Sequence, residues 1–368
     1  MKLESITVTG LFGKSEVVHY EFHHDLNIIT GRNGSGKTTI LKLAWLIMSG
    51  NIYWALKEIN FKICKLVTNE YICVVTKTAN MYCRIELHTS NGESHLFEDD
   101  GPNGENEWIE SSENQAAPYL ISSGSSIFFP TFRRIEGGFS LDVTSRIKNR
   151  AGNRPGGDID EALTSLSKKM SNEEHLFVAA ISSQDINSIL LKKFASLSEQ
   201  INIFQADVSR RVIDKIKHHQ KLSSHASDAD TILTETRIEI EKIETFRAES
   251  MRPLDAVRML VEKLFQHAGI SFDRRFSFGD AAEAVTSDVL SAGEKQMLSF
   301  ICYNAFHQNA IIFIDEPELS LHVDWQRQLY RILKKQNPTN QFIFATHSPF
   351  IYGKYPDKEV AVGVDRGE

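Results

Sequence analysis

The first part of the chain alternates short apolar segments with turns. Residues 5–8 and 17–22 have the alternating pattern of half-buried strands, and the apolar segment Leu26–Thr30 ends at a glycine. From Thr38 to Met48, apolar residues occupy most positions, which predicts a largely buried helix packed on a sheet. The chain is therefore expected to begin with strands, a glycine-rich loop and a helix, in that order.

A second group of strand-like segments follows this helix. Residues 61–66, 71–76, 81–88 and 94–97 are rich in β-branched and aromatic residues and are separated by Asn, Gly and Ser. Their spacing predicts an antiparallel meander. Residues 99–115 are acidic and rich in Gly and Asn, so we expect a surface loop there.

The middle of the chain differs in composition from both ends. The apolar segment Ser126–Phe129 predicts a strand that ends at Pro130. The cluster Gly152–Gly157 is the strongest group of strand and helix breakers, and beyond it Gly and Pro become rare. A domain boundary is therefore expected near residue 150.

Two segments beyond that boundary carry apolar residues at helical spacing. They are Leu190–Ile213 and Ile232–Phe246, and their heptads are not sustained, which favours a short helical hairpin or bundle over a long coiled coil. Pro253 precedes an amphipathic segment and is expected to mark the return to the first domain. The predicted organisation is thus an N-terminal lobe over 1–150, a helical insertion over 151–250 and a C-terminal lobe over 251–368.

Composition narrows the class of protein. The 368 residues are 41% hydrophobic and 24% charged, as in folded globular proteins. With 41 Lys and Arg against 48 Asp and Glu, the formal net charge is −7, which argues against a surface basic all over for nucleic acid but leaves a local basic groove possible. Apolar runs are too short for a membrane span, no signal peptide is evident, and the four cysteines form no Cys-x-x-Cys pair. A cytoplasmic protein with reduced thiols and no membrane partner is expected.

The glycine-rich loop carries the clearest chemistry. Gly31-Arg-Asn-Gly-Ser-Gly-Lys37-Thr38 fits the phosphate-loop pattern and lies between a predicted strand and a predicted helix, as that motif requires. Lys37 would contact the β- and γ-phosphates, and the Thr38 hydroxyl would bind Mg²⁺. A purely structural glycine turn is the alternative, which the flanking strand and helix disfavour. The residues expected to contact ATP are Gly31, Asn33, Gly34, Ser35, Gly36, Lys37, Thr38 and Thr39.

Two further strands deliver polar residues at their carboxyl ends. Ala310–Ile314 is fully apolar and leads into Asp315 and Glu316, which we assign to the Mg²⁺ shell and to the general base that polarises water. Gln341–Ala345 leads into a segment containing His347, which could sense the γ-phosphate. Taken singly, an Asp-Glu pair is more simply a solvated strand end, and a lone His is more often structural.

A predicted helix begins shortly before the Asp315 strand. Leu290-Ser-Ala-Gly-Glu-Lys-Gln296 places Ser291 at its N-cap, with Glu294 three residues on as the partner in a capping box. A well-capped helix is the plain interpretation of this segment.

Taken together, the motifs resemble those of the ABC-type ATPases. Leu290–Glu294 resembles their signature, Ser320-Leu-His322 lies at their D-loop position, and His347 lies at their switch-histidine position. The resemblance implies an α/β ABC-ATPase head with a mixed central sheet, helices and an antiparallel meander, here with a helical insertion. It also implies a homodimer, or a higher even oligomer, that encloses ATP and Mg²⁺. In that family the signature of one subunit completes the phosphate site of the other, so it also assigns Ser291, Gly293 and Glu294 to nucleotide binding.

Details of the motifs resemble the soluble branch of this superfamily. That branch includes chromosome-maintenance and repair ATPases, the overcoming-lysogenization-defect (OLD) nucleases, and ATPases of antiphage systems such as Septu, PARIS and retron-associated modules. The segment Phe128–Arg134 is similar to a Pro-x-x-Arg element of the defence-type group. The family's Q-loop glutamine has no clear counterpart, Gln115 being the nearest candidate.

Three functions remain open on this evidence. The resemblance favours an ATPase that regulates a partner effector, such as a nuclease or toxin, in antiphage defence, with no nuclease activity of its own. The alternative is a RecF-like DNA-repair clamp, for which Arg146–Arg154 and Lys215–Lys221 are the only modest basic candidates. A transporter's nucleotide-binding subunit is disfavoured by the helical insertion and the missing Q-loop.

Overall fold

The computed structural model describes residues 1–99, 111–131, 157–179, 183–222, 226–267 and 291–363. The chain divides into two compact units, Met1–Ser182 with Ser291–Glu368, and Ser183–Leu290. The sequence favoured divisions near residues 150 and 250. The boundaries between the units fall later in the chain, after residues 182 and 290. The helix α4 (Gly157–Met170) and the strand β9 (His175–Phe177) therefore belong to the first unit.

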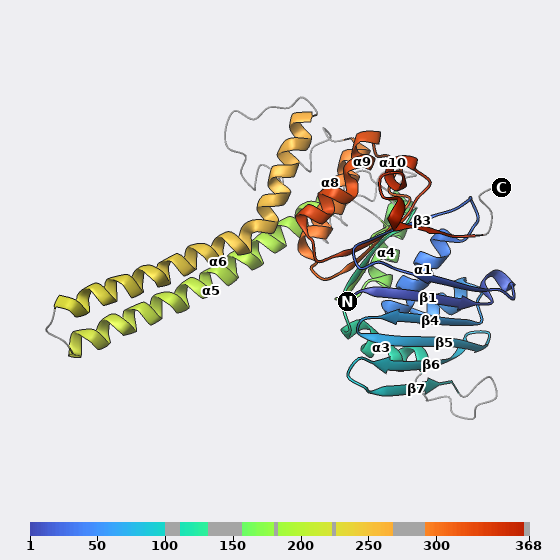
Figure 1. Cartoon of the computed structure of the whole chain (residues 1–368), viewed down its shortest axis with the longest axis horizontal. Coiled ribbons are helices and arrows are strands. Elements are labelled where there is room, and N and C mark those ends of the chain that lie inside the picture. The colour runs from blue at the N-terminus through green and yellow to red at the C-terminus, as the bar shows by residue number, and fades with distance from the viewer. Residues whose placement is uncertain (100–110, 132–156, 180–182, 223–225, 268–290, 364–368) are drawn as a thin grey trace, which may run out of the picture. The chain divides into compact units, whose positions relative to one another are not determined.

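An antiparallel sheet forms one layer of the first unit (Figure 1). Its strand order is β2-β1-β4-β5-β6-β7, and buried residues alternate with less buried ones along its inner strands, as expected of a sheet with one face on the core. This confirms the predicted meander over β4 to β7. The strands are β1 (Leu3–Thr9), β2 (Val17–Glu21), β4 (Ile63–Thr68), β5 (Tyr71–Ala79), β6 (Tyr82–Thr89) and β7 (Ser94–Glu98).

A parallel sheet forms the second layer, in the order β12-β3-β11-β10-β8-β9. All pairings recorded between its described strands are parallel. Every residue of β3, β10 and β11 is buried, which explains why these segments are apolar without alternation. Besides β9, the strands are β3 (Leu26–Thr30), β8 (Ser126–Phe129), β10 (Ile311–Asp315), β11 (Gln341–Ala345) and β12 (Glu359–Ala361).

The helix α1 (Lys37–Met48) joins the two layers. Its buried apolar residues belong to one hydrophobic cluster with residues of both sheets, and it packs on β8, β10 and β11. Trp45 is fully buried and contacts Phe128 and Phe177, with ring centroids 5.7 and 5.4 Å apart. The remaining helical elements of this unit are η1 (Leu11–Gly13), α2 (Ile52–Glu58), α3 (Ser112–Ser122), α8 (Ala292–Phe306), α9 (Val323–Gln336), α10 (Pro349–Tyr352) and η3 (Pro356–Lys358).

Part of the segment 99–115, which was expected to be a surface loop, lies within the described residues. Residues 100–110 lie outside the described residues, but Ser112–Gln115 form the first turn of α3. The Asp99 carboxylate accepts hydrogen bonds from the backbone N–H groups of Cys83 and Ser112, both at 2.7 Å. The prediction was wrong for residues 112–115, because a solvated loop and a helix start held by an acidic side chain contain the same kinds of residue.

The second unit contains two long helices that pack against each other, α5 (Ser183–Leu222) and α6 (Ala226–His267) (Figure 1). The prediction of short helices was wrong, since apolar residues such as Ile203 and Ile213 are exposed and obscure the heptad pattern. Pro253 lies inside α6 and does not end it. Figure 1 shows α6 bending along its length, as expected where proline removes a backbone donor.

None of the helices within the described parts of the chain is long and apolar enough to cross a bilayer.

A buried histidine at the edge of the parallel sheet predicts a pH-dependent stability. His175 has no exposed surface, its Nδ1 lies 2.7 Å from the Ser126 hydroxyl, and burial lowers its pKa from 6.5 to about 4. Above pH 6.5 the histidine is neutral both folded and unfolded. Below it only the unfolded chain gains the proton, so this group removes stability progressively down to pH 4, by about 3 kcal/mol in total.

Urea unfolding between pH 7 and pH 4 measures this loss. His175→Asn should unfold with a smaller pH slope than the wild type, and the same substitution at exposed His24 is the matched control. Equal slopes for the wild type and His175→Asn would contradict the assignment.

Candidate nucleotide site

The loop between β3 and α1 adopts a conformation that requires glycine. Gly36 has φ 98° and Gly34 has φ 79°, both in the left-handed region. A Cβ atom on Gly36 would lie 2.9 Å from the Phe12 ring, and one on Gly31 would lie 2.3 Å from the Val362 carbonyl oxygen. The loop is thus held close to its neighbours, with its amides at the start of a helix, where anions are favoured.

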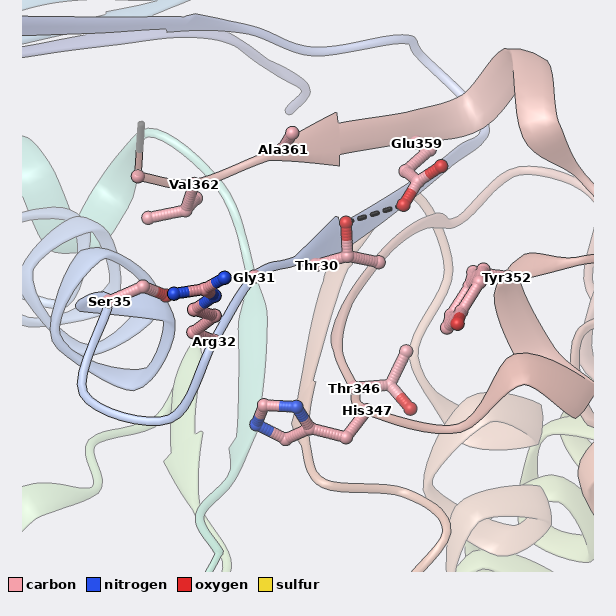
Figure 2. A pocket seen from close by; sticks show the side chains of 11 residues that line it. Thr30, Gly31, Arg32, Ser35, Thr346, His347, Tyr352, Glu359, Ala361 and Val362 are labelled. Atoms are coloured by element: carbon pink, nitrogen blue, oxygen red, sulfur yellow. Dashed lines mark hydrogen bonds between the residues drawn. The ribbon is translucent and has the colours of Figure 1, made fainter. Parts of the chain in front are cut away.

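A cavity of 490 Å³ opens beside this loop. Figure 2 shows Arg32 and Ser35 on the loop side, with His347 and Tyr352 facing them. Thr30 donates a hydrogen bond to Glu359 at 2.5 Å at the cavity's edge. The Ser35 hydroxyl oxygen is buried without a hydrogen-bond partner among the described residues, which suits a group that binds a ligand.

The structure brings together the two residues predicted to hold metal. Thr38, in the first turn of α1, donates a hydrogen bond from Oγ1 to Oδ1 of Asp315 at 3.1 Å. Asp315 is the last residue of β10 and is fully buried. Its second oxygen, Oδ2, accepts a hydrogen bond from the Thr131 hydroxyl.

Lys37 lies at the centre of the site. Its ammonium contacts the Gly31 and Arg32 carbonyl oxygens at 3.1 and 3.2 Å, and the Nε2 atom of His347 at 2.6 Å. Burial lowers the pKa of Lys37, and the nearby carboxylates of Glu316 and Asp315 oppose that shift. Burial, and then the charge of Lys37, lower the pKa of His347, so the neutral imidazole is favoured as the acceptor.

Glu316 leaves β10 in a left-handed conformation with φ 50°, which is strained for a residue with a side chain. Its carboxylate lies 3.5 Å from His347 Nε2. Burial raises the pKa of Glu316 to about 7, with Glu318 and Asp315 adding to the effect and Lys37 opposing it. A carboxylate with this pKa exchanges protons near neutral pH.

Glu318 and Thr131 were not identified from the sequence. Glu318 Oε1 accepts a hydrogen bond at 2.7 Å from the backbone N–H of His347, and so links the segments that follow β10 and β11. The sequence indicated Thr131 only as a member of the Pro-x-x-Arg element within Phe128–Arg134. The signal available for it was its place directly after a buried strand, which is where parallel sheets collect functional residues.

The start of α8 has the predicted cap. The Ser291 hydroxyl accepts a hydrogen bond from the Glu294 N–H, and the Glu294 carboxylate accepts one from the Ser291 N–H at 2.8 Å. This helix end packs against the turn after β10. Gln296 donates to the Pro317 carbonyl at 3.2 Å, and a Cβ on Gly293 would lie 2.1 Å from the Ser320 carbonyl oxygen.

The other sequence candidates take more peripheral places. Asn33 is exposed on the loop, and Thr39 is half-buried in the first turn of α1. Gln115, the nearest Q-loop candidate, lies in α3, which packs on β6 and β7 of the antiparallel sheet. The end of β8, beside Asp315, carries Thr131 instead.

Comparison with known proteins identifies the family. Residues 97–352 match the family described as "AAA domain, putative AbiEii toxin, Type IV TA system", and the chain belongs to this family. The order of its motifs resembles that of the ABC-type ATPases.

Individual relatives are more distant. The Retron Vc95 probable ATPase of Vibrio cholerae serotype O1 biovar El Tor is 28% identical over 86 residues, which make up 20% of this chain and 17% of that protein. The SMC head domain from Thermotoga maritima has a TM-score of 0.37 at 11% identity, covering 96% of this chain and 92% of its own. The Smc head domain with a coiled coil and joint from Pyrococcus yayanosii has a TM-score of 0.41 at 13% identity, covering 100% and 96%. Likeness at this level does not bear on function.

The close approach at Gly293 leads to a stability prediction. An alanine in a helix is ordinarily more stable than glycine, but here its methyl group would meet backbone at 2.1 Å and force α8 away from the turn. Gly293→Ala should therefore lower the free energy of unfolding by about 1–3 kcal/mol in urea titration. Ala292→Gly, at the exposed neighbouring position, is the control for helix propensity. A Gly293→Ala protein more stable than the wild type would refute the close contact.

Proposed function

We propose that this chain binds ATP with Mg²⁺ at the loop Gly31–Thr38, hydrolyses it as a homodimer, and thereby regulates a partner effector in antiphage defence. The observation that carries the first part is the hydrogen bond between Thr38 and Asp315, two residues far apart in the chain. Around that contact lie an ammonium group, a carboxylate with a pKa near neutrality and an imidazole. This set of groups matches the needs of phosphoryl transfer to water.

The donor set suits magnesium. Thr38 gives its hydrogen to Asp315, so the lone pairs of its oxygen stay available to a cation. Hydroxyl and carboxylate oxygens are the hard ligands that Mg²⁺ prefers. Mg²⁺ bound there would neutralise charge that develops on the transferred phosphate. In this proposal Thr38 binds it directly and Asp315 orients Thr38 and the surrounding water.

The remaining residues divide the chemistry among them. The amides of Gly31, Gly34 and Gly36 surround the phosphates, and Lys37 exchanges its carbonyl acceptors for phosphate oxygens, which form stronger charge-assisted hydrogen bonds. Glu316 takes a proton from the attacking water. His347, 3.5 Å from Glu316, holds the water or the γ-phosphate in line.

A dimer completes this site in our proposal. Ser291, Gly293 and Glu294 form a capped helix start on the turn after β10, so this end of the helix can contact the γ-phosphate bound to a second copy. A two-fold axis that brings each signature to the other chain's loop gives two equivalent sites.

The defence role rests on the family and on one relative. The family description includes a putative toxin of a toxin–antitoxin system, and the partial match is to a retron ATPase. An effector of the nuclease or toxin class, on a separate chain, is therefore the partner we propose, with a cytoplasmic location. The alternative is a RecF-like DNA clamp, whose basic candidate Arg146–Arg154 lies outside the described residues.

The proposed hydrolysis predicts different effects for Lys37 and Glu316. Lys37→Ala should weaken ATP binding at least tenfold, because the phosphates lose their cation. Glu316→Gln should still bind ATP but release phosphate about 100-fold more slowly, because the base is gone. Fluorescent-nucleotide binding and phosphate release measure the two effects, and Glu21→Gln, at an exposed glutamate, is the control. Hydrolysis by Glu316→Gln at the wild-type rate would show that another group is the base.

The shared site is tested by mixing two inactive chains. Lys37→Ala removes one half of each site and Ser291→Arg blocks the other, so a mixed dimer keeps one intact site. Each mixed dimer should therefore have up to about half of the activity of a wild-type dimer. If mixed dimers form, as shown by two different affinity tags, but remain as inactive as either parent, the site is not shared.

The effector proposal predicts a nucleotide-dependent complex. ATP can shift the protein only through a difference in affinity between its conformations, so complexes in ATP and ADP should differ. Glu316→Gln, which holds ATP, should co-purify with the product of a neighbouring gene in ATP and lose it in ADP. Purified chain that cleaves DNA or RNA by itself, with cleavage abolished by a point mutation in this chain, would contradict the need for a partner.

A further inference from the structure

The buried Asp315 carboxylate accepts a hydroxyl hydrogen bond on each of its two oxygens. Thr38 donates to Oδ1 at 3.1 Å, and Thr131 donates to Oδ2. Asp315 has no exposed surface, so these oxygens depend on protein donors for their hydrogen bonds. The proposed mechanism uses Thr38 and leaves Thr131 without a role.

The sheet explains why Thr131 reaches this carboxylate. The strands β8 and β10 are parallel neighbours, and Phe129 is paired with Ile314. The residues that follow Phe129 therefore emerge at the edge where Asp315 ends β10. Thr38 reaches the same carboxylate from α1, which packs across β8, β10 and β11.

The two hydroxyls constrain the carboxylate in different ways. An aspartate side chain can turn its carboxylate plane over a broad range, because the terminal torsion has no sharp minima. A donor on Oδ2 fixes that plane and keeps Oδ1 directed at Thr38. Because a threonine hydroxyl is neutral, it does so without cancelling the negative charge that attracts a cation.

We propose that Thr131 is a positioning residue for the magnesium of the ATP site: its hydroxyl holds Asp315 in the orientation that lets Thr38 bind the metal. The inference rests on the proposed ATP-binding function. Donors that orient a ligand or its partner typically change metal affinity 10–100-fold when they are removed. Thr131 should accordingly affect the magnesium dependence of nucleotide binding and leave metal-free binding to the loop intact.

The experiment compares Thr131→Val with Thr131→Ser. Valine keeps the shape and removes the hydroxyl, whereas serine keeps the hydroxyl. Binding of a fluorescent ATP analogue is measured in EDTA and across a magnesium titration, with folding checked by circular dichroism. Thr7→Val is the matched control, because the Thr7 hydroxyl lies 2.8 Å from Nδ1 of His19 in the antiparallel sheet.

We expect Thr131→Val to raise the magnesium concentration at half-saturation about tenfold, with affinity in EDTA within twofold of the wild type and Thr131→Ser close to the wild type. Thr131→Ala serves the same purpose if the valine variant does not fold. An unchanged magnesium midpoint, an equal loss of affinity in EDTA, or failure of serine to restore the midpoint would each overturn the inference. Wild-type protein that binds no nucleotide would instead overturn the proposed function itself.

Discussion

The charge of Asp315 is the constraint on which the site depends, because it lies at the end of β10 with no exposed surface. A buried carboxylate without hydrogen bonds would cost several kcal/mol, so it has to be placed where donors converge. Its two recorded donors, Thr38 and Thr131, come from segments 277 and 184 positions away. Parallel pairing of β8 with β10, and the packing of α1 on both, bring these segments to one edge of the sheet. The fold and the site are therefore specified by the same contacts.

The turn after β10 connects this carboxylate to the rest of the machinery. Glu316 and Ser320 have φ of 50° and 65°, conformations that cost roughly 1–2 kcal/mol each for residues with side chains. Bonds to three neighbours hold the turn: Glu316 N–H to β11, Glu318 to the His347 N–H, and the Pro317 carbonyl to α8. A shift of the turn must disturb all three together. This gives a physical route by which the candidate nucleotide site and the start of α8 can affect each other.

The sequence predicted those parts that local pattern determines. The loop between β3 and α1, the buried strands β10 and β11, and the Ser291 cap each depend on residues close together in the chain, and the structure contains all of them. Thr131 and Glu318 escaped prediction because their roles come from hydrogen bonds to Asp315 and to His347, in other strand ends. The lengths of α5 and α6 were missed for another reason. Helices that pack mainly on each other expose apolar residues along their outer faces, which weakens the periodicity that reveals a long helix.

Lys37 shows how the site can favour an anion through a charge that is already largely removed from water. The residue is only 5% exposed, and its ammonium contacts two carbonyl oxygens and an imidazole. Burial disfavours the charged form of Lys37 and lowers its pKa, and the carboxylates of Glu316, Asp315 and Glu318 oppose that shift. A phosphate would offer a charged acceptor at the same point, with hydrogen bonds roughly twice as strong. Because the ammonium is already largely buried, little further desolvation cost would arise when a phosphate replaces His347 as its partner.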